Sequence, residues 1–252
     1  MIKEITSIKN KTVSDVKKLK QKKHREETGT FLAEGYRNVC DSIHKAVPEM
    51  VFVTANFEHP VPEGNNRYLV TKEVMKELSD TDTPQGIVAV FKIPKEREIT
   101  SSEVLLLNGV SDPGNMGTIL RTALAAGFRD VIVDEKCADV YSPKVIRSAM
   151  SAVFSLNILR VKSLKEQISD LKQMGYSVCG AALTPLAKSI YDTDFSGKIA
   201  LLFGSESNGI EEALLQMADK LYIIPMDSEI ESLNVAVAAG ISMYEITAKK
   251  KR

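Results

Sequence analysis

Three stretches of the chain place polar side chains after apolar segments. Asn115 and Arg121 follow "EVLLLNGV", Glu206 follows "IALLFG", and Ser232 and Asn234 follow "KLYIIP". Amide, carboxylate and hydroxyl groups can orient a substrate by hydrogen bonds, and a guanidinium can bind or stabilise an anion. None of the three stretches contains histidine, the most common general base. The residue types therefore favour positioning and charge stabilisation over histidine-based catalysis.

Other kinds of site lack support in the spacing of residues. The cysteines and histidines are scattered and form no metal-ligand pattern: Cys40, Cys137, Cys179, His24, His44, His59. Isolated cysteines in odd number are typical of reduced thiols. Gly204 and Gly209 are too far apart for a nucleophile elbow, and no stretch has Walker A or dinucleotide-loop spacing. We therefore expect no metal site.

The pattern from residue 103 onward predicts how the polar residues are positioned. Short apolar runs such as "DVIVD", "YSVCGAAL" and "IALLFG" alternate with helical stretches such as "NMGTILRTALAAG" and "SLKEQISDLKQMG". Such alternation predicts a mostly parallel sheet with helices on both faces. Ligands bind in such sheets at the loops beyond the carboxyl ends of the strands. The three polar stretches lie in such loops.

The preceding residues predict a smaller α/β unit. A basic helix or helix pair ends near Gly29, and strand, helix and strand patterns follow up to residue 93. The basic helix has a thin apolar stripe: Ile8, Val13, Val16, Leu19. The charged stretch 94–102 is typical of an interdomain linker. We predict two α/β domains, at residues 1–98 and 99–252.

Positive charge is concentrated at the two ends of the chain. The 252 residues carry 33 basic and 33 acidic side chains, yet residues 1–27 hold nine Lys or Arg against four acids, and the tail Lys249–Arg252 is entirely basic. The N-terminal helix could be a solvated lysine face or a surface for RNA phosphates. The candidate phosphate contacts are Lys17, Lys18, Lys22, Lys23 and Arg25.

Structural alternatives exist for the first two polar stretches. Asn115 is a suitable N-cap for the helix that follows it, and Gly127 a suitable C-terminal stop. Arg121 shares its helix face with small residues and is either functional or part of an interface ion pair. Glu206, in a loop bounded by glycines, is either a catalytic acid or a solvated turn residue.

The third stretch leads into a helix without a polar face. Ser228 and Glu231 have the spacing of a capping box, so part of the polar run could start the helix. The helix "LNVAVAAGISMY" is apolar on every side and must be buried all round. We therefore predict a homodimer interface on one surface of the helix: Ala236, Ala239, Gly240, Met243.

Taken together, the three stretches resemble the SpoU, or TrmH, family of RNA ribose 2′-O-methyltransferases in the SPOUT superfamily. The matching segments are "NMGTILRTA" with Asn115 and Arg121, "FGSESNG" with Glu206, and "IPMDSEIESLNVAVAAG" with Ser232 and Asn234. "KKLKQKKHREETGTFLAEG" and "SDTDTPQGIVAV" resemble the substrate-binding domain of the ribosomal-RNA members. The resemblance covers nearly the whole chain.

The resemblance implies a methyltransferase domain with a deep trefoil knot that binds S-adenosylmethionine at a dimer interface. It points to Gly204, Ile224, Leu233 and Asn234 as cofactor contacts. It also implies catalytic roles for five residues: Asn115, Arg121, Glu206, Ser232, Asn234. The chain departs from the family at Ser228, where glycine is usual. If that position needed positive φ, serine would cost roughly 1 kcal/mol.

The resemblance implies methyl transfer to structured RNA, with 23S ribosomal RNA as the expected substrate and transfer RNA as the second candidate. Two other classes stay open: a noncatalytic RNA-binding or ribosome-assembly protein, and a nucleotide-binding metabolic enzyme, although the phosphate loop of the latter is missing. The N-terminus has no apolar signal segment, and no apolar stretch is long enough to span a bilayer. We therefore expect a cytoplasmic protein without a membrane partner.

Overall fold

The computed structural model describes residues 2–250 and divides into two compact units. The N-terminal unit contains the residues up to Lys95 and, in addition, Asp139–Ser155. The C-terminal unit contains Glu96–Ala138 and the residues from Leu156 onward. The basic tail residues Lys251 and Arg252 lie outside the described residues. The assignment of RNA binding to residues 1–98 and methyl transfer to residues 99–252 stays a prediction.

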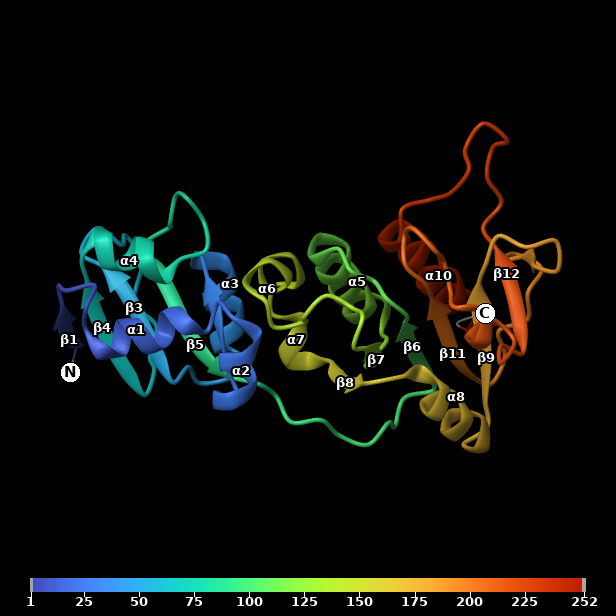
Figure 1. The fold of residues 1–252 in the computed structure, drawn as a ribbon, viewed down its shortest axis with the longest axis horizontal. Coiled ribbons are helices and arrows are strands. Elements are labelled where there is room, and N and C mark those ends of the chain that lie inside the picture. The colour runs from blue at the N-terminus through green and yellow to red at the C-terminus, as the bar shows by residue number, and fades with distance from the viewer. Residues whose placement is uncertain (1, 251–252) are drawn as a thin grey trace. The chain divides into compact units, whose positions relative to one another are not determined.

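The N-terminal unit is built on a mixed five-stranded sheet (Figure 1). Its strands, in spatial order, are β1 (Ile2–Ile5), β4 (Asn66–Val70), β3 (Met50–Thr54), β5 (Ile87–Lys92) and β2 (Thr30–Glu34). β4 pairs in parallel with β1 and β3, whereas β5 runs antiparallel to β3 and β2. The alternation predicted for residues 30–93 is confirmed. β1 was not predicted, because three of its four residues are exposed and give no apolar run.

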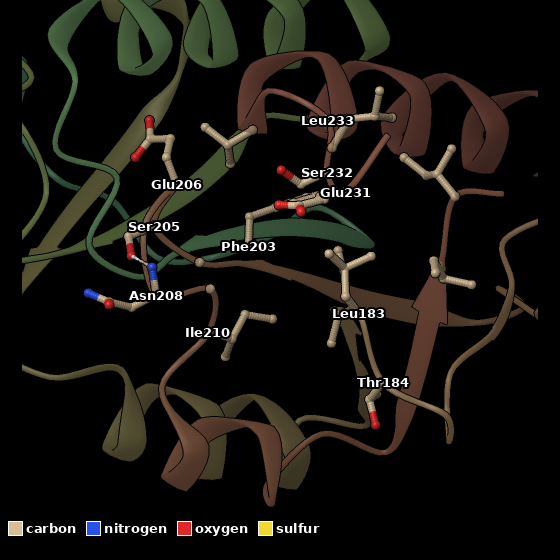
Figure 2. Close-up of a pocket in the computed structure, with 18 of the residues that line it drawn as sticks. Leu183, Thr184, Phe203, Ser205, Glu206, Asn208, Ile210, Glu231, Ser232 and Leu233 are labelled. Carbon is tan, nitrogen blue, oxygen red and sulfur yellow. Dashed lines mark hydrogen bonds between the residues drawn. The ribbon is translucent and has the colours of Figure 1, made fainter. Parts of the chain in front are cut away.

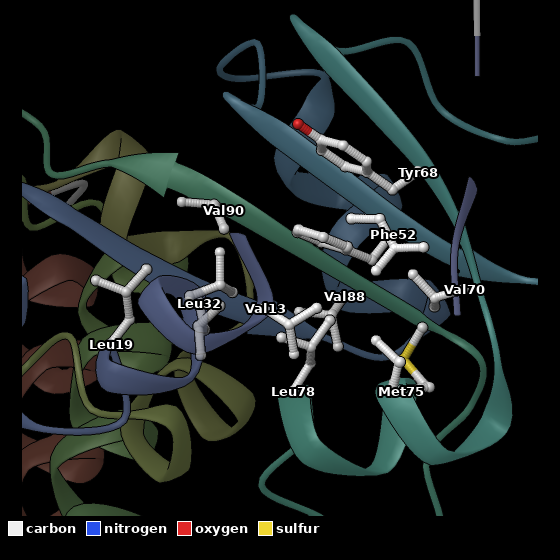
Figure 3. Close-up of a cluster of buried hydrophobic side chains, with 13 residues drawn as sticks. Val13, Leu19, Leu32, Phe52, Tyr68, Val70, Met75, Leu78, Val88 and Val90 are labelled. Atoms are coloured by element: carbon white, nitrogen blue, oxygen red, sulfur yellow. The ribbon is translucent and has the colours of Figure 1, made fainter. Parts of the chain in front are cut away.

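Four helices follow the predicted order: α1 (Lys11–Lys18), α2 (Lys22–Thr28), α3 (Tyr36–Ile43) and α4 (Lys72–Leu78). Gly29 ends α2 with φ of 63°, a left-handed conformation that glycine adopts without strain. Val13, Val16 and Leu19 are buried in a core shared with β3, β4, β5 and α4 (Figure 3). Ile8 is 50% exposed, so its predicted place in the stripe is wrong. It precedes α1 and does not share the buried face of that helix.

The inserted segment of the N-terminal unit contains α6 (Pro143–Ala149) and α7 (Ala152–Ser155). The ring of Phe31 on β2 lies 5.1 Å from that of Tyr141 and 5.5 Å from that of Phe154. Arg147 on α6 forms an ion pair with Glu34, which is buried at the end of β2. Apolar packing and ion pairing therefore join this segment to β2, although it is far from β2 in the sequence.

The C-terminal unit contains a seven-stranded sheet in which all strand pairs between residues 2 and 250 are parallel. In spatial order the strands are β10 (Lys188–Ser189), β12 (Lys220–Ile223), β9 (Tyr176–Ala181), β11 (Lys198–Phe203), β6 (Glu103–Leu107), β7 (Asp130–Asp134) and β8 (Asn157–Val161). The predicted parallel α/β sheet is confirmed. β8 and β10 were not predicted, because β10 has two residues and β8 is partly exposed.

The helices of this unit are α5 (Pro113–Ala126), α8 (Leu164–Gln173), α9 (Glu212–Leu215) and α10 (Val235–Lys250) (Figure 1). α10 packs against α5: the Thr247 hydroxyl donates to the Ala126 carbonyl at 2.9 Å, and a Cβ on Gly240 would lie 3.5 Å from Thr122 Cγ2. No helix within residues 2–250 is long and apolar enough to cross a membrane.

The predicted dimer surface of α10 is corrected by this packing. Ala236, Ala239 and Met243 are buried within the chain's own fold, and Gly240 faces Thr122 of α5. Within the single chain Val237 is 50% exposed and Tyr244 53% exposed, so this fold alone does not bury the helix on every side, as the sequence analysis expected. The small residues Ala236, Ala239 and Gly240 allow α5 and α10 to approach closely. The exposed apolar surface of α10 lies on another side of the helix.

Candidate functional site

The start of α5 brings the Asn115 amide into a loop region at the carboxyl end of the sheet. The N-cap of α5 is Asp112, whose carboxylate accepts a hydrogen bond from the Asn115 backbone N–H at 2.8 Å. Pro113 occupies the first helical position, where its missing N–H is no loss. The prediction that Asn115 caps this helix is therefore wrong, and its side chain is available for other contacts.

A chain of side-chain hydrogen bonds joins all three polar stretches. Asn234 Nδ2 donates to Asn115 Oδ1 at 2.9 Å, and Asn115 Nδ2 donates to Glu206 Oε1 at 2.6 Å. Glu206 and Asn234 are exposed, and Asn115 between them is half-buried. The structure thus brings together residues that lie up to 119 positions apart in the sequence.

The start of α10 determines the direction of these bonds. Asn234 Oδ1 accepts the backbone N–H groups of Ala236 at 2.9 Å and Val237 at 3.2 Å, as an N-cap does. Its amide nitrogen must then point to Asn115, whose own nitrogen is turned toward the carboxylate of Glu206. The predicted capping box of Ser228 and Glu231 is wrong, because α10 begins only at Val235.

A cavity of about 570 Å³ lies beside this hydrogen-bonded chain (Figure 2). Gly204, Ile224 and Leu233, which the sequence proposed as cofactor contacts, line it, as do Glu206 and Ser232. Asn234 is not among the lining residues, although its neighbours Leu233 and Val235 are. Figure 2 shows Leu233, Ser232 and Glu231 along one side of the cavity and Ile210 on another.

The loop after β11 is a tight turn that only glycine permits at its first position. The backbones of Ser205 and Gly209 exchange two hydrogen bonds of 3.0 Å, and Ser205 Oγ accepts the Asn208 N–H at 3.1 Å (Figure 2). A Cβ on Gly204 would lie 2.0 Å from the Gly209 carbonyl carbon. The missing side chain therefore allows the turn that presents Glu206.

Sequence reasoning missed one wall of the cavity, formed by residues 181–184 at the end of β9 and directly after it. This stretch, "AALT", has no charged residue and no unusual spacing. Its position follows from the sheet order, because β9 lies between β11 and β12 and all three strands run in parallel. Only knowledge of that order could have indicated it.

A polar network that joins the buried Asn108 and Asp134 to the exposed Lys136 and Glu211 was also missed. Asn108 Nδ2 donates to Asp134 Oδ2 at 2.7 Å, and Asn108 Oδ1 accepts the Glu211 N–H at 2.9 Å. The Glu211 carboxylate accepts hydrogen bonds from the Lys136 ammonium and from the Asn108 amide. These two contacts, of which Lys136 has the larger effect, hold the pKa of the Glu211 carboxyl below the usual range. The network ties the ends of β6 and β7 to the segment after the Glu206 loop.

Arg121 does not line the cavity. It is exposed on α5 and has no ion-pair or hydrogen-bond partner within residues 2–250. The ion pair considered as its structural alternative is therefore not formed within the described chain. Its catalytic role stays a prediction.

The candidate RNA contacts fall into two groups. Lys17, Lys18, Lys22 and Lys23 are exposed, and each has an acidic neighbour: Glu77, Asp15, Glu26 and Glu27, respectively. Arg25 is 3% exposed, binds the Asp139 carboxylate and donates to the Leu19 carbonyl at 2.6 Å. Arg25 therefore holds the inserted segment, and its expected contact with RNA phosphate does not fit this burial.

The sequence analysis also considered metal binding, the cysteine thiols and backbone strain at Ser228. Within residues 2–250, no three His, Cys, Asp or Glu side chains are grouped to hold a metal ion. Burial raises the pKa of Cys137 to about 12 and that of Cys179 to about 11, so both thiols are protonated at neutral pH.

Among residues 2–250, only Met150 is a non-glycine residue with positive φ, so the strain considered for Ser228 does not arise.

Comparison with known proteins identifies the family of the chain. Residues 102–244 match the SpoU rRNA Methylase family, and residues 10–89 match the MRM3-like substrate binding domain. The chain is 36% identical over 248 residues to the 23S rRNA (guanosine(2553)-2′-O)-methyltransferase RlmP of Bacillus subtilis, covering 97% of this chain and 99% of that protein.

Two solved structures share the fold. A putative RNA methyltransferase of the TrmH family from Porphyromonas gingivalis superposes with a TM-score of 0.85 at 30% identity, covering 96% of this chain and 100% of that one. An AdoMet-bound rRNA methyltransferase from Sinorhizobium meliloti superposes with a TM-score of 0.83 at 30% identity, covering 98% of each chain. The chain is therefore a methyltransferase and belongs to the SpoU rRNA methylase family.

Proposed function

We propose that this chain transfers a methyl group from S-adenosylmethionine to a ribose 2′-hydroxyl of 23S ribosomal RNA. The observation that carries the proposal is the hydrogen-bonded chain of Asn234, Asn115 and Glu206 beside the cavity. The Bacillus relative is named for this reaction on a guanosine of 23S rRNA. The equivalent guanosine is therefore the first position to examine.

The cavity suits S-adenosylmethionine in size and lining. Its volume of about 570 Å³ lies within the usual range for small-molecule sites. Apolar side chains such as Ile210 and Leu233 can cover an adenine ring, while the loop backbone around Gly204 and Ile224 can bind its edge. When bound, S-adenosylmethionine supplies an electrophilic methyl group on a sulfonium ion.

The residues of the site orient the ribose hydroxyl and the cofactor. Asn234 fixes the amide of Asn115, which in turn binds the carboxylate of Glu206, a residue that lines the cavity. Ser232 also lines the cavity and can hydrogen-bond either substrate. Arg121, exposed on α5, is assigned to the RNA side, where its guanidinium binds phosphate or stabilises the hydroxyl as it loses its proton.

Methyl transfer to unmodified 23S rRNA tests the proposal. Labelled S-adenosylmethionine is incubated with the enzyme and the transcript, and the RNA is hydrolysed with alkali. Label is expected in alkali-resistant dinucleotides, because a 2′-O-methyl group blocks cleavage at that ribose. Transfer RNA is assayed in parallel, and label in transfer RNA alone would show that transfer RNA is the substrate and 23S rRNA is not. Cofactor binding without label in either RNA would contradict both proposed substrates. Failure to bind the cofactor would favour a noncatalytic RNA-binding protein.

The proposal includes two properties implied by the family resemblance, a trefoil knot in the C-terminal unit and a homodimer, and a cytoplasmic location expected from the apolar pattern of the sequence. The exposed apolar side chains of Val237 and Tyr244 on α10 support a homodimer, since a second copy would cover them. They replace the buried residues that the sequence proposed for that surface. Sedimentation at several protein concentrations measures the association, and a monomer at all of them would contradict it.

The four exposed lysines of α1 and α2 form the proposed phosphate-binding surface. Exposed ion pairs contribute little to stability, so their acidic neighbours can yield to RNA phosphates. Changing Lys17, Lys18, Lys22 and Lys23 to Gln is expected to reduce the slope of log K against log salt by about 3. Filter binding to 23S rRNA between low and high salt measures the slope.

A matched control removes the same charge from exposed lysines of the C-terminal unit: Lys162, Lys165, Lys172, Lys188. The control variant is expected to keep the slope of the parent protein. An equal loss of slope in both variants would mean that net charge matters and that the position of the lysines does not.

A further inference from the structure

An aromatic cluster in the N-terminal unit has no role in the site described above. The rings of Tyr36 and His59 are stacked, with centroids 3.7 Å apart and planes 14° apart. The ring of Phe57 lies 5.6 Å from that of His59 at 69°. Tyr36 and Phe57 are half-buried, whereas His59 is exposed. These three residues, here called the aromatic platform, form a stacked pair of Tyr36 and His59 with Phe57 against the edge, and the His59 side chain is exposed to solvent.

Hydrogen bonds hold the two loops that carry the platform, one after β2 and one after β3. The Tyr36 N–H donates to Gln85 Oε1 at 2.9 Å, which ties the start of α3 to the loop before β5. The Phe57 N–H donates to the Thr54 carbonyl at 3.0 Å at the end of β3. These bonds order the loops before any ligand binds. A ligand that stacks on the platform therefore pays little conformational entropy for ordering them.

We propose that the aromatic platform stacks an unpaired base of the RNA substrate. This inference deepens the proposed function and rests on RNA being the substrate. Aromatic side chains bind bases that are free of a duplex, in loops, bulges and ends. Arg37, exposed on the first turn of α3 next to Tyr36, adds positive charge for the adjacent phosphate. All of these residues lie in the region matching the substrate binding domain, 10–89.

The platform and the lysine surface differ in the kind of contact they make. Lysines bind phosphates by charge and release counterions, so their contribution falls as salt rises. Stacking on a ring depends on the face of a base and is far less sensitive to salt. Loss of the platform is therefore expected to weaken RNA binding without changing the salt slope.

The absence of tryptophan from the sequence makes a direct test possible. His59→Trp places a single fluorescent ring on the platform, and His44→Trp places one at an exposed histidine beyond the end of α3. The probes are an RNA hairpin with a bulged adenosine and the same hairpin fully paired. The bulged hairpin is expected to quench the tryptophan fluorescence of the His59→Trp variant, and the paired hairpin is not. Equal responses to the two hairpins, or equal responses of both variants, would overturn the proposal.

A second measurement separates this proposal from the proposed function. His59→Ala is expected to weaken binding of a 23S rRNA transcript on the order of tenfold, with an unchanged salt slope. His59→Trp is expected to retain binding, and His44→Ala serves as the control. Unchanged RNA affinity in His59→Ala, in an enzyme that methylates the transcript, would overturn the platform alone. Platform-dependent RNA binding without methyl transfer by the parent enzyme would overturn the proposed reaction alone.

Discussion

Arg121→Ala is expected to reduce methyl transfer to 23S rRNA by about 10² to 10³-fold, the effect of removing one charge-stabilising donor from a transition state. Binding of S-adenosylmethionine is expected to be unchanged, because Arg121 does not line the cavity. Stability should change little, since the side chain is exposed and has no partner within residues 2–250. Single-turnover methyl transfer and calorimetric titration of the cofactor measure the two effects.

Two further variants define what Arg121 contributes. Arg121→Lys retains the positive charge but loses the planar guanidinium, and we expect it to recover only a small part of the activity. Arg129→Ala removes another exposed arginine beyond the end of α5 and should be nearly neutral. Near-normal turnover by Arg121→Lys, with unchanged RNA affinity, would exclude a specific guanidinium role.

Gly204→Ala is expected to abolish measurable cofactor binding and with it methyl transfer. Its Cβ would lie 2.0 Å from the Gly209 carbonyl carbon and 2.1 Å from the Ile210 nitrogen. Both are backbone atoms of the turn that presents Glu206, so the turn must open. Forcing atoms into a packed site typically destabilises a protein by about 1 to 3 kcal/mol. Thermal denaturation and calorimetric titration measure both losses.

Gly240→Ala provides the matched control on α10. Its Cβ would lie 3.5 Å from Thr122 Cγ2, an ordinary van der Waals contact, and alanine favours a helix interior by roughly 0.5 to 1 kcal/mol over glycine. We expect normal cofactor binding and a small gain in stability. If the Gly204→Ala enzyme bound the cofactor as tightly as the Gly240→Ala control, the conformation of the turn after Gly204 would not be required for cofactor binding.

The periodicity of the sequence predicted the parallel sheet that carries the site, except for β8 and β10. Apolar runs such as β6 and β11 are buried on both faces, and a parallel sheet gathers their following loops at one edge. The contact of Asn115 with Glu206 also requires β6 and β11 to be neighbours, which the structure shows and the periodicity does not. The activity itself was indicated by the family resemblance, because composition and spacing alone left several kinds of site open.

Other features depend on long-range contacts that a single sequence does not display. Asp112 competes with Asn115 as the cap of α5, and only the backbone geometry decides between them. In the sequence Arg25 is one more charge of a basic helix, and its partner Asp139 lies 114 residues away. The apolar stretch 181–184 becomes part of the cavity only through the order of the strands.

The inserted segment Asp139–Ser155 determines how the protein would respond to proteolysis. A single cut in the stretch 94–102 would sever the chain but leave this segment packed with Phe31 and Arg25, while its two ends continue into β7 and β8 of the other fragment. The nicked protein should therefore elute as one species and separate only in denaturant. For the same reason, neither unit could be exchanged between relatives as an independent module unless the inserted segment were exchanged to match.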